Sequence, residues 1–114
     1  MKKILINVDC FGDFDTDAVD HVTRDIVQSL GDDFAVIAYS PVFCERQRYE
    51  LLQWLVDNGF EAEELILRED NDYSRRGEAI LGFLTNIKDV ALIIESDARI
   101  ADSLRDEGFK VWEA

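Results

Sequence analysis

Cysteine, histidine and long apolar runs are scarce in this sequence, and each scarcity excludes a class of protein. Two cysteines, Cys10 and Cys44, fit reduced thiols better than a disulfide framework. The one histidine, His21, falls on an expected helix, and no arginine follows Cys10 at the spacing that a cysteine phosphatase needs. No apolar run approaches the roughly 20 residues of a membrane span. No signal peptide is apparent either, so we expect a cytoplasmic protein without membrane association.

Basic residues are also few. The chain contains 12 lysines and arginines and 25 aspartates and glutamates, which gives a formal net charge of −13. This balance argues against extended nucleic acid as a partner, because cationic side chains supply most of the affinity for phosphates. It argues equally against anionic membrane surfaces. The charge serves solubility, or it forms an acidic face that docks on a basic protein partner or imitates DNA.

Apolar runs of strand length alternate with amphipathic segments along the chain. This β-α-β alternation favours a mostly parallel sheet with helices on both faces. The 114 residues suit a single α/β domain spanning 1–114. The expected strands are 4–8, 34–39, 64–67, 90–94 and 109–112, and the expected helices are about 16–30, 45–58, 75–85 and a last one from 98 to 107.

The helices are expected to begin at capping residues and to bury one face each. Asp15 or Thr16 is a possible cap for the first helix, Ser74 for the third and Asp97 for the last. The expected inward residues are Val19, Val22, Ile26 and Leu30 in the first helix, Leu51, Leu52, Trp54 and Leu55 in the second, and Ile80, Leu81, Phe83 and Leu84 in the third.

Polar side chains gather where the expected strands end, which is where open parallel sheets bind ligands. Carboxylates and an amide follow the first strand, a hydroxyl follows the second, two arginines open the third helix, and a carboxylate follows the fourth strand. Together they resemble the set of side chains used in Mg²⁺-assisted phosphoryl transfer, in which carboxylate oxygens bind the metal and a hydroxyl and a cation bind the phosphate. The residues concerned are Asn7, Asp9, Ser40, Arg75, Arg76 and Glu95.

Several stretches resemble motifs of one enzyme family in the same order. Residues 39–55 contain YSP and then ELLQWL, and NGF at 58–60 and ELILR at 64–68 follow. DNDY at 70–73 precedes the two arginines, and LIIESD occupies 92–97. The chain resembles the haloacid dehalogenase (HAD) superfamily, in particular the phosphatase domain of polynucleotide kinase-phosphatases. The resemblance implies a three-layer Rossmann-like fold without a cap domain, with the strands in the order 3-2-1-4-5.

This sequence departs from the family pattern at the positions of the family's catalytic residues. The first family motif, D-x-D-x-T, corresponds to residues 7–11 (NVDCF). Asn7 would replace the nucleophilic aspartate, while Asp9 would keep the general acid/base position. A carboxamide is a poor nucleophile and cannot ionise, so the covalent aspartyl-phosphate route should fail.

The remaining motif positions imply a phosphate site and a weak metal site. Ser40 fits the hydroxyl of the second motif, and Arg76 or Arg75 replaces the usual lysine that holds the phosphate. Glu95 stands in place of an aspartate, so Asp9 and Glu95 would bind Mg²⁺ weakly, if at all.

We therefore expect a HAD-like protein with impaired catalysis that binds a phosphorylated small molecule or a protein partner. One alternative is an active Mg²⁺-dependent phosphatase for nucleotide or nucleic-acid phosphate ends, with Asp9 in an unorthodox role. Another is an acidic interaction protein or DNA mimic. A small domain with eroded motifs would suit a phage or mobile-element genome.

Two further features lie in the segment after the first strand. DFDTD at 13–17 resembles the opening of a calcium loop, but Ala18 and Arg24 occupy the positions where an EF-hand needs Gly and Glu. Loose metal attraction by the aspartates of this segment stays open. Phe11 and Phe14 are expected at the mouth of the site, as a lid or a contact surface.

Overall fold

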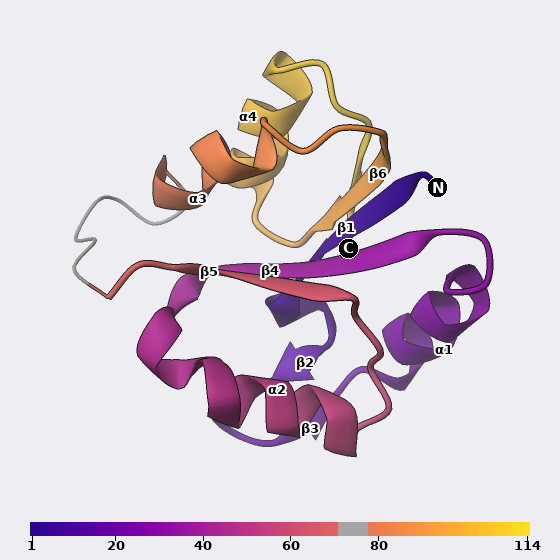
Figure 1. Ribbon diagram of the computed structural model, residues 1–114, viewed down its shortest axis with the longest axis vertical. Coiled ribbons are helices and arrows are strands. Elements are labelled where there is room, and N and C mark those ends of the chain that lie inside the picture. Colours follow the sequence, from indigo (N-terminus) through magenta and orange to yellow (C-terminus); the bar gives the residue numbers. More distant parts are fainter. Residues whose placement is uncertain (71–77) are drawn as a thin grey trace.

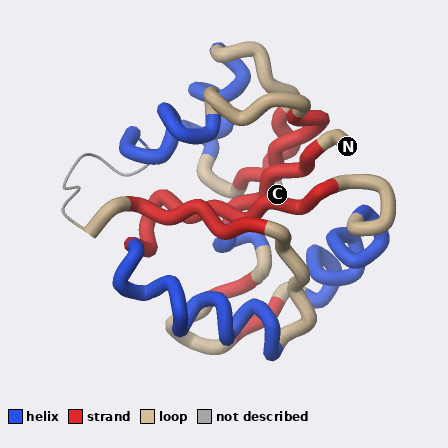
Figure 2. The backbone as a smooth tube through the Cα atoms, viewed as in Figure 1, coloured by secondary structure: helices blue, strands red, loops and turns tan. Residues whose placement is uncertain are grey.

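Five parallel strands form the central sheet, in the order β5-β4-β1-β6-β7 (Figures 1 and 2). The structure is a computed structural model that describes residues 1–70 and 78–114, and only the backbone of 78–80. The order β5-β4-β1-β6-β7 is the expected order 3-2-1-4-5 of the main strands. Every strand pairing in this sheet is parallel, as expected. The strands are β1 (Lys3–Asn7), β4 (Ala35–Cys44), β5 (Glu64–Arg68), β6 (Val90–Glu95) and β7 (Val111–Glu113).

Helices cover both faces of the sheet, as the alternating pattern predicted (Figure 1). On one face, α1 (His21–Leu30) and α2 (Arg48–Asp57) bury Val27, Leu51 and Leu55 against the sheet. On the other face, α3 (Glu78–Leu84) and α4 (Ala98–Asp106) pack through Leu84 and Leu104. Among the described residues, no helix combines the length and the apolar character that crossing a membrane requires.

Alternation along β1 divides the core into these two layers. Ile4 and Ile6 face the α1 and α2 side, whereas Leu5 faces the α3 and α4 side. All three side chains are almost completely buried, which explains why the strand is apolar on both faces. Asn7 ends the strand on the same side as Leu5, because successive side chains alternate.

The segment between β1 and α1 is where the sequence-based expectation was wrong. Residues expected to begin the first helix form an antiparallel hairpin of β2 (Gly12–Asp13) and β3 (Ala18–Val19). The hairpin requires Gly12, whose φ of +144° suits glycine and where a Cβ would collide with the carbonyl oxygen of Ala18. The helix therefore begins later, and its cap is Asp20, whose Oδ1 accepts a hydrogen bond from the Thr23 N–H at 2.9 Å.

This shift also changes which side chains are buried. Val22 is 70% exposed and Val19 lies in β3, so the expected inward face of the first helix was wrong at both residues. Phe83 and Leu52 were expected to be inward and are exposed, at 50% and 38%. By contrast, Asp97 caps α4 as expected, with its Oδ1 accepting from the Arg99 N–H at 2.9 Å.

Strand β4 is longer than expected and continues through Pro41 to Cys44. Its pairing with β5 shifts register between Ser40 and Cys44, so the proline lies in an irregular part of the ladder. Proline lacks an N–H and is tolerated in strands at such irregularities. The serine and the proline therefore lie within β4, and the strand carries the chain onward to the short 3₁₀ turn η2 (Glu45–Gln47) that precedes α2.

Aromatic rings join the hairpin to the core on the α2 side. Phe11 was expected at an open site mouth, but it is fully buried, and its ring centroid lies 4.2 Å from that of Phe60. Phe14 packs edge-on against Trp54, with centroids 5.8 Å apart. The expected lid is therefore part of the core at Phe11, and Phe14 contacts the flank of α2.

Phe11→Ala should destabilise the protein strongly, because it removes a fully buried ring. We expect the free energy of unfolding to fall by roughly 3–5 kcal/mol in urea denaturation. Phe83→Ala makes the same chemical change at a half-exposed site and should cost less than about 1 kcal/mol. Equal losses for the two variants would show that the hairpin does not depend on the buried ring.

Candidate functional site

Strand register brings three polar side chains together at the carboxyl end of the sheet. Asn7 of β1 pairs in register with Tyr39 of β4, and Glu95 follows Ile94 of β6, which pairs with Ile6 of β1. All three side chains are buried, with exposures of 1%, 0% and 0%. Buried polar groups at this end of a doubly wound sheet mark the position where ligands usually bind.

The carboxylate of Glu95 is the centre of this group. Its Oε1 accepts hydrogen bonds from the Tyr39 hydroxyl at 2.7 Å and from Asn7 Nδ2 at 2.9 Å. Its Oε2 accepts from Asn7 Nδ2 at 2.9 Å and from the backbone N–H groups of Ser96 and Asp97 at 2.7 and 2.9 Å. Every one of these neighbours donates to the carboxyl group, so both oxygens act as acceptors in the network.

Asn7 connects this carboxylate to the turn that follows β1. Its Oδ1 accepts the Asp9 N–H at 2.9 Å and caps the 3₁₀ turn η1 (Val8–Cys10), while its Nδ2 faces Glu95. An aspartate here could accept the same N–H, but it would place a second carboxylate against Glu95 and would offer no donor. The amide is therefore the side chain that satisfies both neighbours.

Burial and the charge of Glu95 also raise the pKa values of two nearby titratable groups, Cys10 and Tyr39. Burial, and next the negative charge of Glu95, raise the pKa of the Cys10 thiol to about 12. The thiol donates a weak hydrogen bond to the Ile94 carbonyl at 3.8 Å. Burial, and next the charge of Glu95, raise the pKa of the Tyr39 phenol as well, so it remains a donor at neutral pH.

The other expected site residues are placed differently. Ser40 is fully buried, and its Oγ accepts the backbone N–H groups of Val42 and Phe43 at 3.1 and 3.0 Å, so it stabilises the irregular end of β4. Asp9 is half-buried within η1. Arg75 and Arg76, the expected phosphate-binding cations, lie outside the described residues, as does Ser74.

In this arrangement, hydrogen-bond donors rather than a cation surround the expected metal ligand Glu95. Both oxygens of Glu95 already accept hydrogen bonds, and N–H groups point at them where a cation would have to sit. Among the described side chains, those of residues 1–70 and 81–114, no three or more His, Cys, Asp or Glu lie close enough to share a metal ion, and this includes the aspartates after β1. The roles of Asp9 and Glu95 as metal ligands stay predictions.

Tyr39 is the network residue that sequence reasoning missed. It ends an apolar run, AVIAY, and was assigned to a strand and to the YSP motif, but its hydroxyl was given no role. A tyrosine at the carboxyl end of a buried strand needs a partner for its hydroxyl, and that need was the available signal.

Comparison with known proteins shows the fold and not the family. No protein-family model matches the chain, and no match was found among curated proteins. One chain of the solved Pnkp1/Rnl/Hen1 complex is similar in structure, with a TM-score of 0.85 at 13% sequence identity. The similarity covers 99% of this chain but 45% of that one, so this chain spans less than half of its structural neighbour. The α/β fold expected from the sequence is thus confirmed by a solved structure.

Asn7→Asp should destabilise the protein. It removes the donor that faces Glu95 and places two carboxylates together where water is excluded. We expect a loss of roughly 3 kcal/mol in the free energy of unfolding at neutral pH, measured by urea denaturation. Asn86→Asp is the matched control, because Asn86 is exposed, and it should cost less than about 1 kcal/mol.

Reversing the pair tests whether charge causes that loss. In the double variant Asn7→Asp/Glu95→Gln, the new glutamine amide can donate to the new carboxylate, and its oxygen can still accept the Ser96 and Asp97 N–H groups. We expect the double variant to recover at least about half of the stability lost in Asn7→Asp. No recovery would mean that shape rather than charge pairing sets the requirement at these positions.

Both cysteine thiols should resist modification in the folded protein at pH 8. Cys10 and Cys44 are 6% and 2% exposed, and the pKa of Cys10 leaves almost no thiolate. Ellman's reagent should detect two thiols only after urea unfolding. The pKa of Cys10 is higher in the folded protein than its unfolded value of about 8.5. The protonated thiol therefore contributes fully to stability below about pH 8.5, and this contribution is lost as the pH rises from there toward the folded pKa. Rapid reaction of one thiol under native conditions would contradict this assignment.

Proposed function

We propose that this chain is a HAD-like protein of phosphatase fold that lacks the aspartyl-phosphate reaction and acts by binding. The observation that carries the proposal is the buried hydrogen bond from Asn7 to Glu95, at 2.9 Å to each carboxylate oxygen. It ties together the two positions that, by the family resemblance, would hold the nucleophile and a metal ligand. Similarity of fold alone cannot assign an activity, so the proposal rests on this chemistry.

Neither end of the Asn7 amide is available for phosphoryl transfer. The nitrogen donates to Glu95, and the oxygen accepts the Asp9 N–H. The side chain is 1% exposed, so an attacking position in line with a phosphate ester is closed. Ionisation cannot activate the amide, whereas a nucleophilic carboxylate is already charged at neutral pH.

Among the binding roles, a protein partner is better supported than a phosphorylated small molecule. Ser40, the expected phosphate-binding hydroxyl, is fully buried, and its oxygen accepts two backbone N–H groups. The formal net charge of −13 repels phosphate and attracts basic surfaces. Binding of a phosphorylated ligand would have to depend on Arg75 and Arg76.

The wild-type protein should not hydrolyse p-nitrophenyl phosphate faster than buffer does, with or without Mg²⁺. Asn7→Asp should gain no turnover while Glu95 still faces position 7, and Mg²⁺ should not raise the melting temperature of the wild type. Release of p-nitrophenol and thermal unfolding with and without Mg²⁺ measure these outcomes. Mg²⁺-dependent turnover by the wild type that Asp9→Asn abolishes would instead establish the active phosphatase with Asp9 as an essential group.

A further inference from the structure

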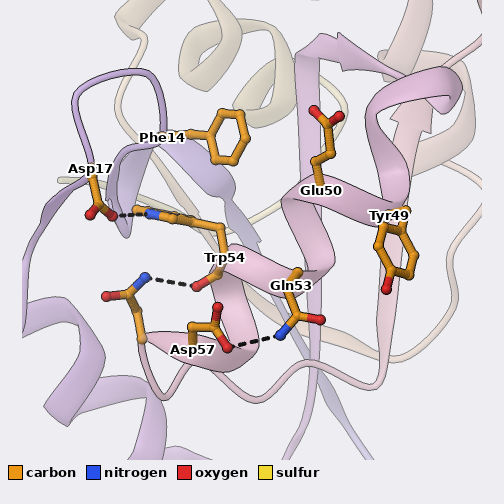
Figure 3. A pocket seen from close by; sticks show the side chains of 8 residues that line it. Phe14, Asp17, Tyr49, Glu50, Gln53, Trp54 and Asp57 are labelled. Atoms are coloured by element: carbon orange, nitrogen blue, oxygen red, sulfur yellow. Dashed lines mark hydrogen bonds between the residues drawn. The ribbon is translucent and has the colours of Figure 1, made fainter.

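A pocket of about 550 Å³ lies between α2 and the β2-β3 hairpin (Figure 3). These elements lie on the side of the sheet away from α3 and α4 (Figure 1). This size is typical of sites that hold a small molecule or a few side chains. Its lining combines aromatic rings with carboxylates and amides, from Phe14, Asp17, Tyr49, Glu50, Gln53, Trp54, Asp57 and Asn58. Nothing in the proposed function uses this pocket.

The aromatic part of the pocket is held in place by the hairpin. Trp54 Nε1 donates a hydrogen bond of 2.7 Å to Asp17 Oδ1, and Phe14 meets the indole edge-on with centroids 5.8 Å apart (Figure 3). Phe14 also packs edge-on against Phe43 at 5.5 Å. Asp17 adopts a φ of +56°, in the left-handed region that aspartate tolerates in turns. Phe14 and Trp54 are therefore held in place before a ligand arrives, whereas the ring of Tyr49 is 79% exposed.

The charged side chains that line the pocket are all negative. Asp17, Glu50 and Asp57 contribute carboxylates, and no lysine or arginine lines the pocket. Asp17 and Asp57 accept hydrogen bonds from neutral donors, the latter from Gln53 Nε2 at 2.8 Å. Within the described part of the chain, none of the three carboxylates forms an ion pair with a lysine or arginine. Their charge is therefore available to a cation from outside.

An apolar stripe on α2 continues the surface beside the pocket. Tyr49, Leu52 and Val56 are spaced three and four residues apart, so they lie on one side of the helix. They are 79%, 38% and 67% exposed. An occupant that enters the pocket can thus also cover apolar surface next to it, which a free ion would not do.

We propose that this pocket docks an arginine side chain of a basic protein segment. The guanidinium group can stack on the exposed ring of Tyr49 while it donates to a carboxylate of the pocket, a combination that suits arginine better than lysine. A second copy of this chain would bring carboxylates against carboxylates, and a nucleic acid would bring phosphates, so charge disfavours both. The inference goes beyond the proposed function, because the pocket does not include the Asn7–Glu95 network.

The test measures binding of fluorescein-labelled oligo-arginine to the full chain by fluorescence anisotropy, with oligo-lysine of equal length for comparison. We expect the arginine peptide to bind more tightly. Glu50→Gln/Asp57→Asn should weaken its binding about tenfold, because two exposed carboxylates each contribute a modest attraction. Tyr49→Ala should weaken it about 2- to 5-fold through loss of stacking on the guanidinium group.

A matched control separates the pocket from the general negative charge. Asp106→Asn/Glu107→Gln removes the same two charges from the exposed end of α4, on the opposite face of the sheet, and should change binding less than about 2-fold. Equal weakening by both double variants would overturn the proposal, and so would equal affinity for the two peptides or no binding at all. Self-association that Tyr49→Ala abolishes would identify a second copy as the occupant instead. None of these results depends on whether the protein hydrolyses phosphate esters.

Discussion

A buried carboxylate must be surrounded by donors, and much of the arrangement at the carboxyl end of this sheet follows from that requirement at Glu95. Three strands each contribute to it: β1 supplies an amide, β4 a hydroxyl and β6 the carboxylate with the two N–H groups that follow it. Removing one donor would leave charge unsatisfied in a place that water does not reach. The network therefore fixes the register of neighbouring strands as well as the chemistry that their ends can perform.

The two faces of the sheet have separate chemical characters. The polar network lies on the side of α3 and α4, where Tyr39 belongs to the apolar layer formed with Leu84 and Leu104. The aromatic contacts of the hairpin lie on the side of α1 and α2, around Trp54. The strand-end network and the pocket beside α2 therefore lie in different layers of the core.

The alternation of strands with helices could be predicted because apolar runs of strand length and capping residues such as Asp97 act locally, whereas the strand order was implied by the family resemblance. The hairpin could not, because the need for glycine at Gly12 arises from its close approach to Ala18 on the partner strand, which a helical pattern conceals. The strand-end residues were found by position, yet their roles depend on partners. Whether Glu95 binds a metal or accepts hydrogen bonds from Asn7 and Tyr39 is decided by side-chain direction, which periodicity does not supply.

The sequence separation within the network has a consequence for how the protein folds. Asn7 and Glu95 are 88 residues apart, although their strands are neighbours. β1 can pair early with β4, but its other edge stays open until β6 has been placed, and closing so long a loop is slow. During that interval an apolar strand edge is available to other chains. The hydrogen bond from Asn7 to Glu95 can form only after β6 has paired with β1. We therefore expect it to form late in folding, when the centre of the sheet is completed.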